Sequence, residues 1–359
     1  MFVKEAREPT RRGLLKTSGA TLLTVPFLSR RAVAQDAIFL VSVPDAALEK
    51  FVIDDVAPIM RRRYGATIRT RTAASSGALS TLRAQRRAPT LIATTLDQSY
   101  AIQALQEDLV EPVSVGRVPH LADVMGKAKV ADDSIVSFIL SVDTLCYNTD
   151  AWQGAPKSYR EVFRDGPVSK AAIPSPSGGI GFEFLAILSS IATGKPLVEA
   201  ALELEAGINY LARYRDKFGM IYARTQEVMP LLANGDMSSC FTKTRFLTDW
   251  MERKAAVDCT VPQEGAFYSL NCLLPVKGSP SLDMGMAFID TMLSPAIQSR
   301  LASKIGSAPV NLKAESKIPD ALKNVVPTPA QIDSLVLLPD LTPLRVASVA
   351  KMFNAKIAR

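Results

Sequence analysis

Hydrophobic positions along the chain alternate between short unbroken runs and longer stretches with helical spacing. Residues 37–43 form a short apolar run, which is typical of a strand buried on both faces. From 48 to 60 the apolar residues recur at helical spacing; Pro58 is expected to kink that helix and Gly65 to end it. Two further strands are expected at 66–72 and 91–95, each followed by a helix. This order predicts an α/β fold with a mostly parallel, doubly wound sheet.

Two apolar passages, 135–147 and 264–275, have no stretch with helical spacing. The pattern between them predicts strands at 170–173, 237–242 and 257–261 and helices at 180–193, 197–218, 226–234 and 245–254; helices at 281–292 and 295–305 follow. We therefore expect two α/β lobes joined by two crossings that form a hinge. The expected bounds are 35–141 with 273–312 for lobe one and 142–272 for lobe two, with C-terminal helices in 313–359 that pack back across or onto lobe two.

The first 34 residues have the three parts of an export signal. Residues 10–16 (Thr-Arg-Arg-Gly-Leu-Leu-Lys) form a twin-arginine pattern, residues 19–28 are apolar, and Ala32-Val33-Ala34 offers a small-residue cleavage site. The apolar run is about half of the roughly 20 residues that a membrane-spanning helix needs. The sequence therefore predicts a mature protein that begins near Gln35 and works in the periplasm, exported by the twin-arginine machinery.

Removing that segment changes the charge of the protein. The chain of 359 residues has 42 Lys and Arg against 35 Asp and Glu, a net charge of +7. Residues 1–34 hold seven basic and two acidic residues, a net of +5, which leaves about +2 for the mature part. Neither nucleic acid nor an anionic membrane is therefore expected as a partner.

The chain lacks the usual signatures of metal sites, cofactor sites and enzymes. His120 is the only histidine, and the spacing of the four cysteines matches no zinc pattern. We find no Gly-x-Ser-x-Gly, His-Glu-x-x-His, dinucleotide or phosphate-loop motif, so no cofactor is expected. The cysteines Cys146, Cys240, Cys259 and Cys272 each lie in an apolar run, which favours buried free thiols. An exported protein can also form disulfides, and the pairings Cys240–Cys259 and Cys146–Cys272 stay open.

Three passages carry a resemblance to a known family: Leu145–Thr149, Leu232–Asp236, and Gln263–Tyr268 continuing through Ser294-Pro295 to Pro309-Val310-Asn311. The chain resembles, from about Ile38 to Arg359, the periplasmic solute-binding proteins of ABC importers, in the group that contains the spermidine/putrescine-binding proteins. The resemblance implies the type II periplasmic binding fold of the extracellular solute-binding family 1. It also implies a monomer that delivers a small-molecule solute to ABC permease subunits in the inner membrane.

In such a fold the ligand lies between the lobes, off the carboxyl ends of the strands, where helix N-termini point inward. The residues expected there follow predicted strands, begin helices or lie in a crossing: Asp45, Ser75, Ser76, Asp97, Asp143, Ser177, Gly178, Thr242, Tyr268 and Asn271. Each serine taken alone is as well explained as a helix cap.

The sequence does not identify the solute. Polyamine-binding members of the family carry a tryptophan and an aspartate where this chain has Ser269 and Asn271, which weakens the case for a polyamine. Three acids (Asp45, Asp97, Asp143) and three bases (Arg224, Lys243, Arg245) are expected near the cleft, a mixture that also suits a zwitterion or a small carboxylate. Iron is disfavoured because no two tyrosines are adjacent.

Two other classes of function are alternatives to a solute-binding protein. The first is a transferase on the same fold, similar to the thiaminases, with Cys146 or Cys272 as the nucleophile; no histidine lies near either cysteine in the sequence to activate it. The second is an interaction protein whose cleft binds nothing. Neither has a motif in its favour, so we expect a binding protein and not an enzyme.

Overall fold

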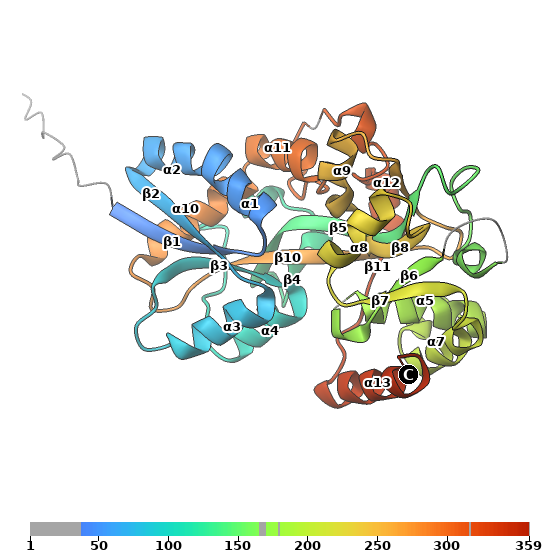
Figure 1. Cartoon of the computed structure of the whole chain (residues 1–359). Helices are drawn as coiled ribbons and strands as arrows, with labels where there is room; N and C mark the ends of the chain where they lie inside the picture. Colours follow the sequence, from blue (N-terminus) through green and yellow to red (C-terminus); the bar gives the residue numbers. More distant parts are fainter. Residues whose placement is uncertain (1–36, 165–169, 179, 316, 359) are drawn as a thin grey trace, which may run out of the picture. The chain divides into compact units, whose positions relative to one another are not determined.

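The computed structural model describes residues 37–164, 170–178, 180–315 and 317–358 (Figure 1). The predicted twin-arginine signal, its cleavage site near Ala34 and Gln35 lie outside the described residues. Within the described part, no helix is both long enough and apolar enough to cross a bilayer.

The first α/β region forms as the hydrophobic pattern predicts. Strand β1 (Ala37–Val43) lies between β2 (Ala66–Thr72) and β3 (Leu91–Asp97), and both pairs are parallel. The helices of this region are α1 (Ala46–Phe51), α2 (Ala57–Tyr64), α3 (Ser75–Ala84) and α4 (Gln98–Gln106). Figure 1 shows α1 and α2 on one face of these strands and α3 and α4 on the other. The carboxyl ends of β1 and β3 therefore meet at one edge.

The expected irregularity near Pro58 lies one turn before it. Residues Val52–Val56 form a π-helical turn between α1 and α2, and Pro58 occupies the first turn of α2, where its missing N–H costs no hydrogen bond. Gly65 ends α2 with a φ of 65°, which glycine adopts without strain.

The two helix-free passages are the crossing strands β5 (Ile135–Asn148) and β10 (Phe267–Pro275). The two apolar runs expected at 135–147 form a single strand of 14 residues, all of them buried. Strand β10 pairs antiparallel with β3 on one side and β5 on the other. The other end of β5 pairs antiparallel with β8 (Ser239–Lys243) and β9 (Val257–Thr260). These strands, with β4 (Lys129–Val130) and β11 (Val336–Leu337), make a nine-stranded sheet in the described residues.

The second α/β region contains the strands β6 (Ala171–Pro174) and β7 (Phe218–Tyr222), which pair in parallel. Its helices are α5 (Gly181–Thr193), α6 (Leu197–Ala200), α7 (Leu204–Leu211), α8 (Thr225–Ala233) and α9 (Thr248–Glu252). Two short 3₁₀ turns, Ala212–Tyr214 and Thr244–Leu247, replace parts of the helices expected at 197–218 and 245–254.

The single long helix predicted at 197–218 is wrong. The chain leaves the helical conformation between α6 and α7, and strand β7 begins at Phe218. The break lets Gly207 of α7 approach α5 so closely that a Cβ atom there would lie 2.2 Å from the Leu185 carbonyl oxygen. Apolar periodicity does not reveal such a break, because α6 and α7 both bury residues at helical spacing.

Buried hydrophobic side chains fall into two clusters, one for each lobe of the type II fold. On β5, Val142 belongs to the first cluster and Leu145 to the second. On β10, Phe267 belongs to the second cluster and Tyr268 to the first. Helices α10 (Leu282–Leu293) and α11 (Pro295–Ile305) follow the second crossing as predicted, and most of their buried side chains belong to the first cluster. The proposed lobe boundaries at 141/142 and 272/273 stay predictions, close to these changes.

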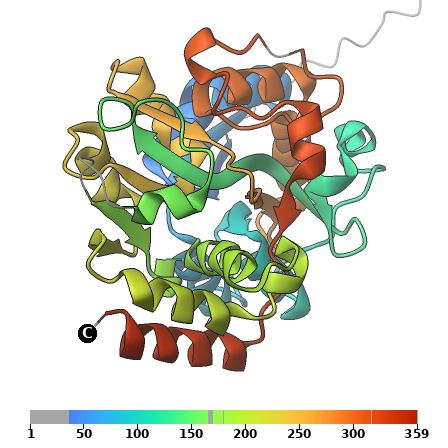
Figure 2. The ribbon, with the colours of Figure 1, turned by 90° about the vertical axis from the view of Figure 1, so that its right-hand side faces the viewer.

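The C-terminal segment contacts both clusters. Ile332 of α12 (Pro329–Ser334) packs in the first, whereas Val349 and Phe353 of α13 (Pro343–Lys356) pack in the second. Figure 2 shows α13 along the outer side of the helices of the second region.

All four cysteines are free and buried, which confirms the favoured interpretation over either disulfide. Cys146 on β5 lies opposite Cys240 of β8 and Cys259 of β9.

Candidate functional site

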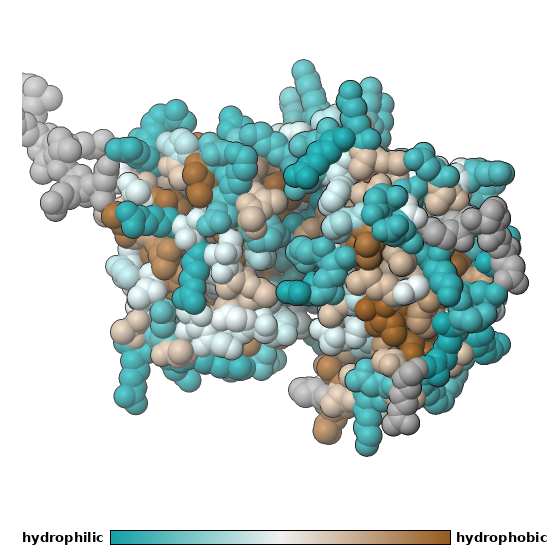
Figure 3. Space-filling model, viewed as in Figure 1, coloured by the Kyte–Doolittle hydropathy of each residue, from teal (hydrophilic) through white to brown (hydrophobic). Residues whose placement is uncertain are grey.

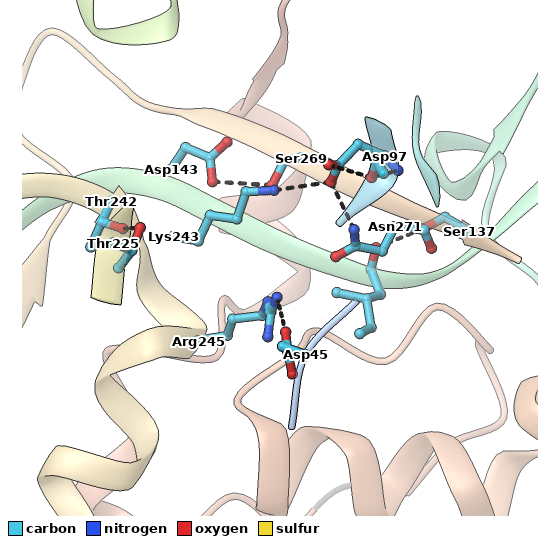
Figure 4. Close-up of polar contacts among 12 residues, drawn as sticks. Asp45, Asp97, Ser137, Asp143, Thr225, Thr242, Lys243, Arg245, Ser269 and Asn271 are labelled. Atoms are coloured by element: carbon cyan, nitrogen blue, oxygen red, sulfur yellow. Dashed lines mark hydrogen bonds and ion pairs between the residues drawn. The ribbon is translucent and has the colours of Figure 1, made fainter. Parts of the chain in front are cut away.

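Charged side chains gather where β3 and β8 end beside the two crossing strands (Figure 4). We call this set the interlobe polar cluster. Its charged members are Asp45, Asp97, Asp143, Glu183, Lys243 and Arg245, and its neutral members are Ser75, Ser269 and Asn271. Figure 3 shows the surface notched between the part that carries α3 and α4 and the part that carries α13.

Asp97 and Lys243 connect the two lobes at the ends of their strands. Lys243 Nζ lies 3.3 Å from Asp97 Oδ1, and the same oxygen accepts a hydrogen bond of 2.8 Å from Asn271 Nδ2. Asn271 reaches it because the two residues are directly opposite in the β10–β3 ladder. Ser75 Oγ donates to Asp97 Oδ2 over 2.8 Å. Burial alone would raise the pKa of Asp97, but the Lys243 ammonium and the Ser75 hydroxyl bring it below its usual value.

Asp45 and Arg245 make a second contact between the lobes. Arg245 Nη2 lies 2.8 Å from Asp45 Oδ2, while Asp45 Oδ1 accepts the Leu48 amide and so caps α1. The guanidinium also lies over the Phe246 ring, 4.3 Å from its centroid. Burial acts to raise the pKa of Asp45, but the charge of Arg245, its hydrogen bond and the Leu48 amide together outweigh burial and lower the pKa.

Asp143 is fully buried in the middle of the cluster. It lies opposite Lys243 in the β5–β8 ladder, so that both side chains are on one face of the sheet. Its Oδ1 accepts a hydrogen bond of 3.1 Å from Ser269 Oγ, but its Oδ2 has no partner among the described residues. Burial raises the pKa of Asp143 to about 6, although Lys243 acts in the opposite direction.

Glu183 is the charged residue that sequence reasoning missed. It lies in the first turn of α5, and its Oε2 is buried without a partner among the described residues. Burial raises the pKa of Glu183 to about 8, the Asp143 carboxylate adds to this rise, and Lys243 opposes it. A signal was present in the sequence: Glu183 stands four residues before Ile187 on the apolar stripe of the predicted helix.

Lys243 is the central cation of the cluster. Burial acts to lower its pKa, but Asp97 and Asp143 have the larger combined effect and raise it, so the side chain stays charged. The cluster thus contains four carboxyl groups and two cations. Three further buried polar atoms near it have no partner in the described part of the chain: Gln98 Oε1, Ser141 Oγ and Arg245 Nε.

The structure brings together five of the ten residues predicted to line the site: Asp45, Ser75, Asp97, Asp143 and Asn271. Thr242 does not point into the cluster, because it alternates with Lys243 along β8 and pairs with Thr225, Oγ1 to Oγ1 2.8 Å. Ser76 is exposed on α3. Ser177 is exposed in the short 3₁₀ turn Pro176–Gly178, and its hydroxyl is 2.9 Å from that of Ser175.

Tyr268 lies on the opposite face of β10 from Ser269 and Asn271. Side chains alternate along a strand, so residues separated by an odd number of positions cannot share a face. Tyr268 packs in the first hydrophobic cluster, with Lys127 Nζ 5.4 Å from its ring centroid. Arg224 is also outside the cluster, since its side chain is 77% exposed and bonds Glu227.

Two further features bear on a metal site and on a cysteine nucleophile. The described residues contain no group of three His, Cys, Asp or Glu side chains arranged to hold a metal ion. The two candidate nucleophiles, Cys146 and Cys272, have no exposed surface, and burial raises the pKa of both thiols above the usual value.

The sequence matches a known protein family. Residues 56–326 match the family described as bacterial extracellular solute-binding protein. No curated protein matches the sequence.

Solved structures share the fold over most of the chain at low sequence identity. An extracellular solute-binding protein from Bordetella parapertussis is 20% identical, covers 90% of this chain and 99% of its own, and has a TM-score of 0.72. The spermidine/putrescine ABC transporter substrate-binding protein PotD from Streptococcus pneumoniae is 15% identical, with coverages of 89% and 98% and a TM-score of 0.75. AgtB from A. tumefaciens R10, solved with agropinic acid, is 16% identical, with coverages of 90% and 97% and a TM-score of 0.67.

Proposed function

Because this chain belongs to the bacterial extracellular solute-binding protein family, we propose that the interlobe polar cluster is where it binds its solute. Members of this family are substrate-binding components of ABC transporters, not enzymes, and work outside the cytoplasm with membrane permease subunits. The solute that we propose is a small polar organic molecule, held between the lobes and then delivered to the permease.

One observation carries this assignment: the charged groups of the two lobes face one another. Lys243 and Arg245 from the second region meet Asp97 and Asp45 from the first. Burying charges costs free energy unless partners compensate them, and a protein that only needed a stable junction would do as well with apolar side chains. A polar solute that enters this junction exchanges hydrogen bonds with both lobes at once. Its binding therefore favours the closed arrangement of the lobes.

Three solute classes fit the residue types: a polyamine, an amino-acid-like zwitterion and a small carboxylate. The carboxyl groups favour amines, the two cations favour carboxylates, and both are present in a zwitterion. The similar structures include a spermidine/putrescine-binding protein and a protein solved with agropinic acid, so the fold alone does not select among the classes. We further propose that the precursor is exported by the twin-arginine machinery, cleaved near Ala34, and acts as a monomer.

A thermal-shift panel tests the proposed function. Purified protein is heated with polyamines, amino acids, opines, phosphonates and small carboxylates, one at a time. A solute present at 100 times its dissociation constant adds about 2.7 kcal/mol to the free energy of unfolding, which gives a clear rise in the midpoint. Small-angle scattering should then show a smaller radius of gyration with a saturating amount of that solute. If no compound in the panel raises the midpoint, the proposed solute-binding function is wrong.

A further inference from the structure

Building on the proposed function, we infer that Asp143 and Glu183 receive a protonated amino group of the solute. The solute is then an organic amine that binds as its ammonium ion, whether or not it also carries a carboxylate. Glu183 is not among the residues expected from the sequence, and an ammonium-binding role for the two acids excludes carboxylates that have no amino group.

The carboxyl groups of the cluster outnumber its cations. Each cation of the cluster already has a carboxylate within ion-pair distance: Lys243 Nζ is 3.3 Å from Asp97, and Arg245 Nη2 is 2.8 Å from Asp45. Asp143 and Glu183 are the carboxyl groups that remain. A solute that brings a positive charge reduces this acidic excess, whereas a solute with only negative charge would add to it.

The cluster also leaves hydrogen bonds unmade in the described part of the chain. Asp143 Oδ2 and Glu183 Oε2 are both buried and both without a donor among the described residues. A buried acceptor without a donor costs about 1–3 kcal/mol, more if it is charged. An ammonium group has three N–H donors and no acceptor, so one such group has enough donors for both oxygens. A carboxylate, a sulfonate or a phosphonate has no donor to offer them when ionised.

Access to this place requires movement of the lobes. Asp143 has no exposed surface, and the Asp97–Lys243 and Asp45–Arg245 contacts join the two lobes beside it. Separation of the lobes breaks both contacts and exposes the acids to the solute. The unpartnered Arg245 Nε then offers one donor to an acceptor elsewhere on the same solute.

Proton linkage follows from the surroundings of the two acids. The charged groups that act on Glu183 are Asp143, Lys243 and Asp97; Asp143 also interacts with Arg245 and accepts the hydrogen bond of Ser269. With the lobes in contact and no solute bound, burial raises the pKa of Glu183 to about 8, so near neutral pH this group is largely protonated. An ammonium ion beside it favours the ionised form. Binding therefore releases a proton, and the affinity for the amine increases as the pH rises from about 6 to about 8.

The test compares amines with solutes that lack an amino group. Putrescine and 4-aminobutyrate are the amine probes; butyrate and succinate are the controls. Isothermal titration is carried out on the wild type and on Asp143→Asn and Glu183→Gln, which keep the side-chain shape. Glu199→Gln, an exposed acid on α6 of the same region, is the matched control variant.

We expect at least one amine to bind the wild type more tightly than butyrate or succinate. Each cluster variant should weaken that amine about 10-fold to 100-fold, and Glu199→Gln should leave it unchanged. Titration in two buffers of different ionisation enthalpy should show proton release at pH 7 in the wild type, and Glu183→Gln should abolish it. A residue that was only structural would not change that proton count.

The inference is overturned if the amine-free solutes bind as tightly as the amines, or if the amines bind both variants with wild-type affinity. In either case the proposed solute-binding function stands. If none of the four probes binds the wild type, the inference is overturned, and the thermal-shift panel decides separately whether the proposed function stands. The pH dependence of the wild type gives an independent check, should a variant not fold.

Discussion

Arg245 and Asp45 are 200 positions apart in the chain, yet Arg245 Nη2 and Asp45 Oδ2 are 2.8 Å apart. The arginine side chain is only 5% exposed and the aspartate 17%. The aspartate begins the first helix of one lobe, and the arginine follows the last residues of β8 in the other. A desolvated guanidinium in the second lobe thus depends on a carboxylate of the first, which links stability of the protein to contact between its lobes.

Replacing Asp45 by asparagine should therefore destabilise the solute-free protein. Asparagine caps a helix as well as aspartate does, so the variant removes the charge and keeps the cap of α1. Removing one partner of a buried ion pair costs about 3–5 kcal/mol, and the partial exposure of Asp45 places this variant at the lower end. Urea denaturation measures the change. Asp54→Asn, which breaks the exposed Lys50–Asp54 pair, is the control and should cost less than about 1 kcal/mol. An equal effect of the two variants would contradict the importance of the Arg245–Asp45 contact.

Lys243→Met should destabilise the protein much more at pH 8 than at pH 5. The variant leaves Asp97, Asp143 and Glu183 without the cation between them. At pH 8 these acids repel one another around the fully buried Asp143, whereas at pH 5 protonation relieves the repulsion. Urea midpoints at the two pH values measure the difference. Lys195→Met, which breaks an exposed pair with Glu203, should show no such dependence. A loss of stability that is the same at both pH values would contradict this account.

The solute-free wild type should lose stability as the pH rises from about 6 to about 8.5. The pKa of Asp143 is raised to about 6 and that of Glu183 to about 8, so both acids bind protons more tightly in the folded than in the unfolded chain. Such groups stabilise the fold at low pH, and this contribution is lost as the pH rises through the raised values. Denaturation midpoints between pH 6 and 8.5 measure it. In Glu183→Gln the decrease should be smaller, and a midpoint that rises over this range in the wild type would show that the two acids are not buried together.

None of the four cysteines should react with iodoacetamide in the native protein. All four are buried and free, and burial raises the pKa of every one of them, that of Cys240 to about 12. The reactive thiolate is therefore scarce and shielded. Mass spectrometry should find no label under native conditions and four labels after unfolding. Rapid labelling of Cys146 or Cys272 in the native protein would instead favour the transferase hypothesis.

Export gives a prediction about the residues that precede the described part. Changing both Arg11 and Arg12 to lysine should retain the precursor in the cytoplasm, because the twin-arginine pattern is the recognised element of the signal. Cell fractionation and N-terminal sequencing measure the outcome, and Lys4→Arg serves as a control that leaves the pair intact. Normal appearance of a mature protein that starts near Gln35 would exclude the twin-arginine route and leave an ordinary secretory signal.

Much of the fold could be predicted because the information is local. Strand β1 is a short, mostly apolar run, strands β2 and β3 lie where the pattern predicts them, and the helices after them follow the 3.6-residue period and end at residues such as Gly65. The lack of helix in 135–147 and 264–275 correctly indicated the crossings. Strand β7 was missed because Phe218–Tyr222 continues the apolar spacing of the helix before it, and only packing against β6 makes it a strand.

The candidate site shows which features follow from the local sequence and which depend on the tertiary structure. Asp97 ends a strand and Asn271 lies within a crossing, and these positions were enough to predict that both residues lie in the junction. The sequence also contained the evidence against Tyr268, since it is three positions from Asn271 in the same strand and therefore faces the other way.

Which charges are buried together was decided only by the tertiary structure. Arg245 became a buried partner of Asp45, and Glu183 a neighbour of Asp143, through the meeting of elements far apart in the chain. The free energy of a charge depends on its desolvation and on the charges around it, and neither is a property of the neighbouring sequence. The hydrophobic pattern determined the elements and their order, and the assembly of the two lobes determined the electrostatics of the place between them.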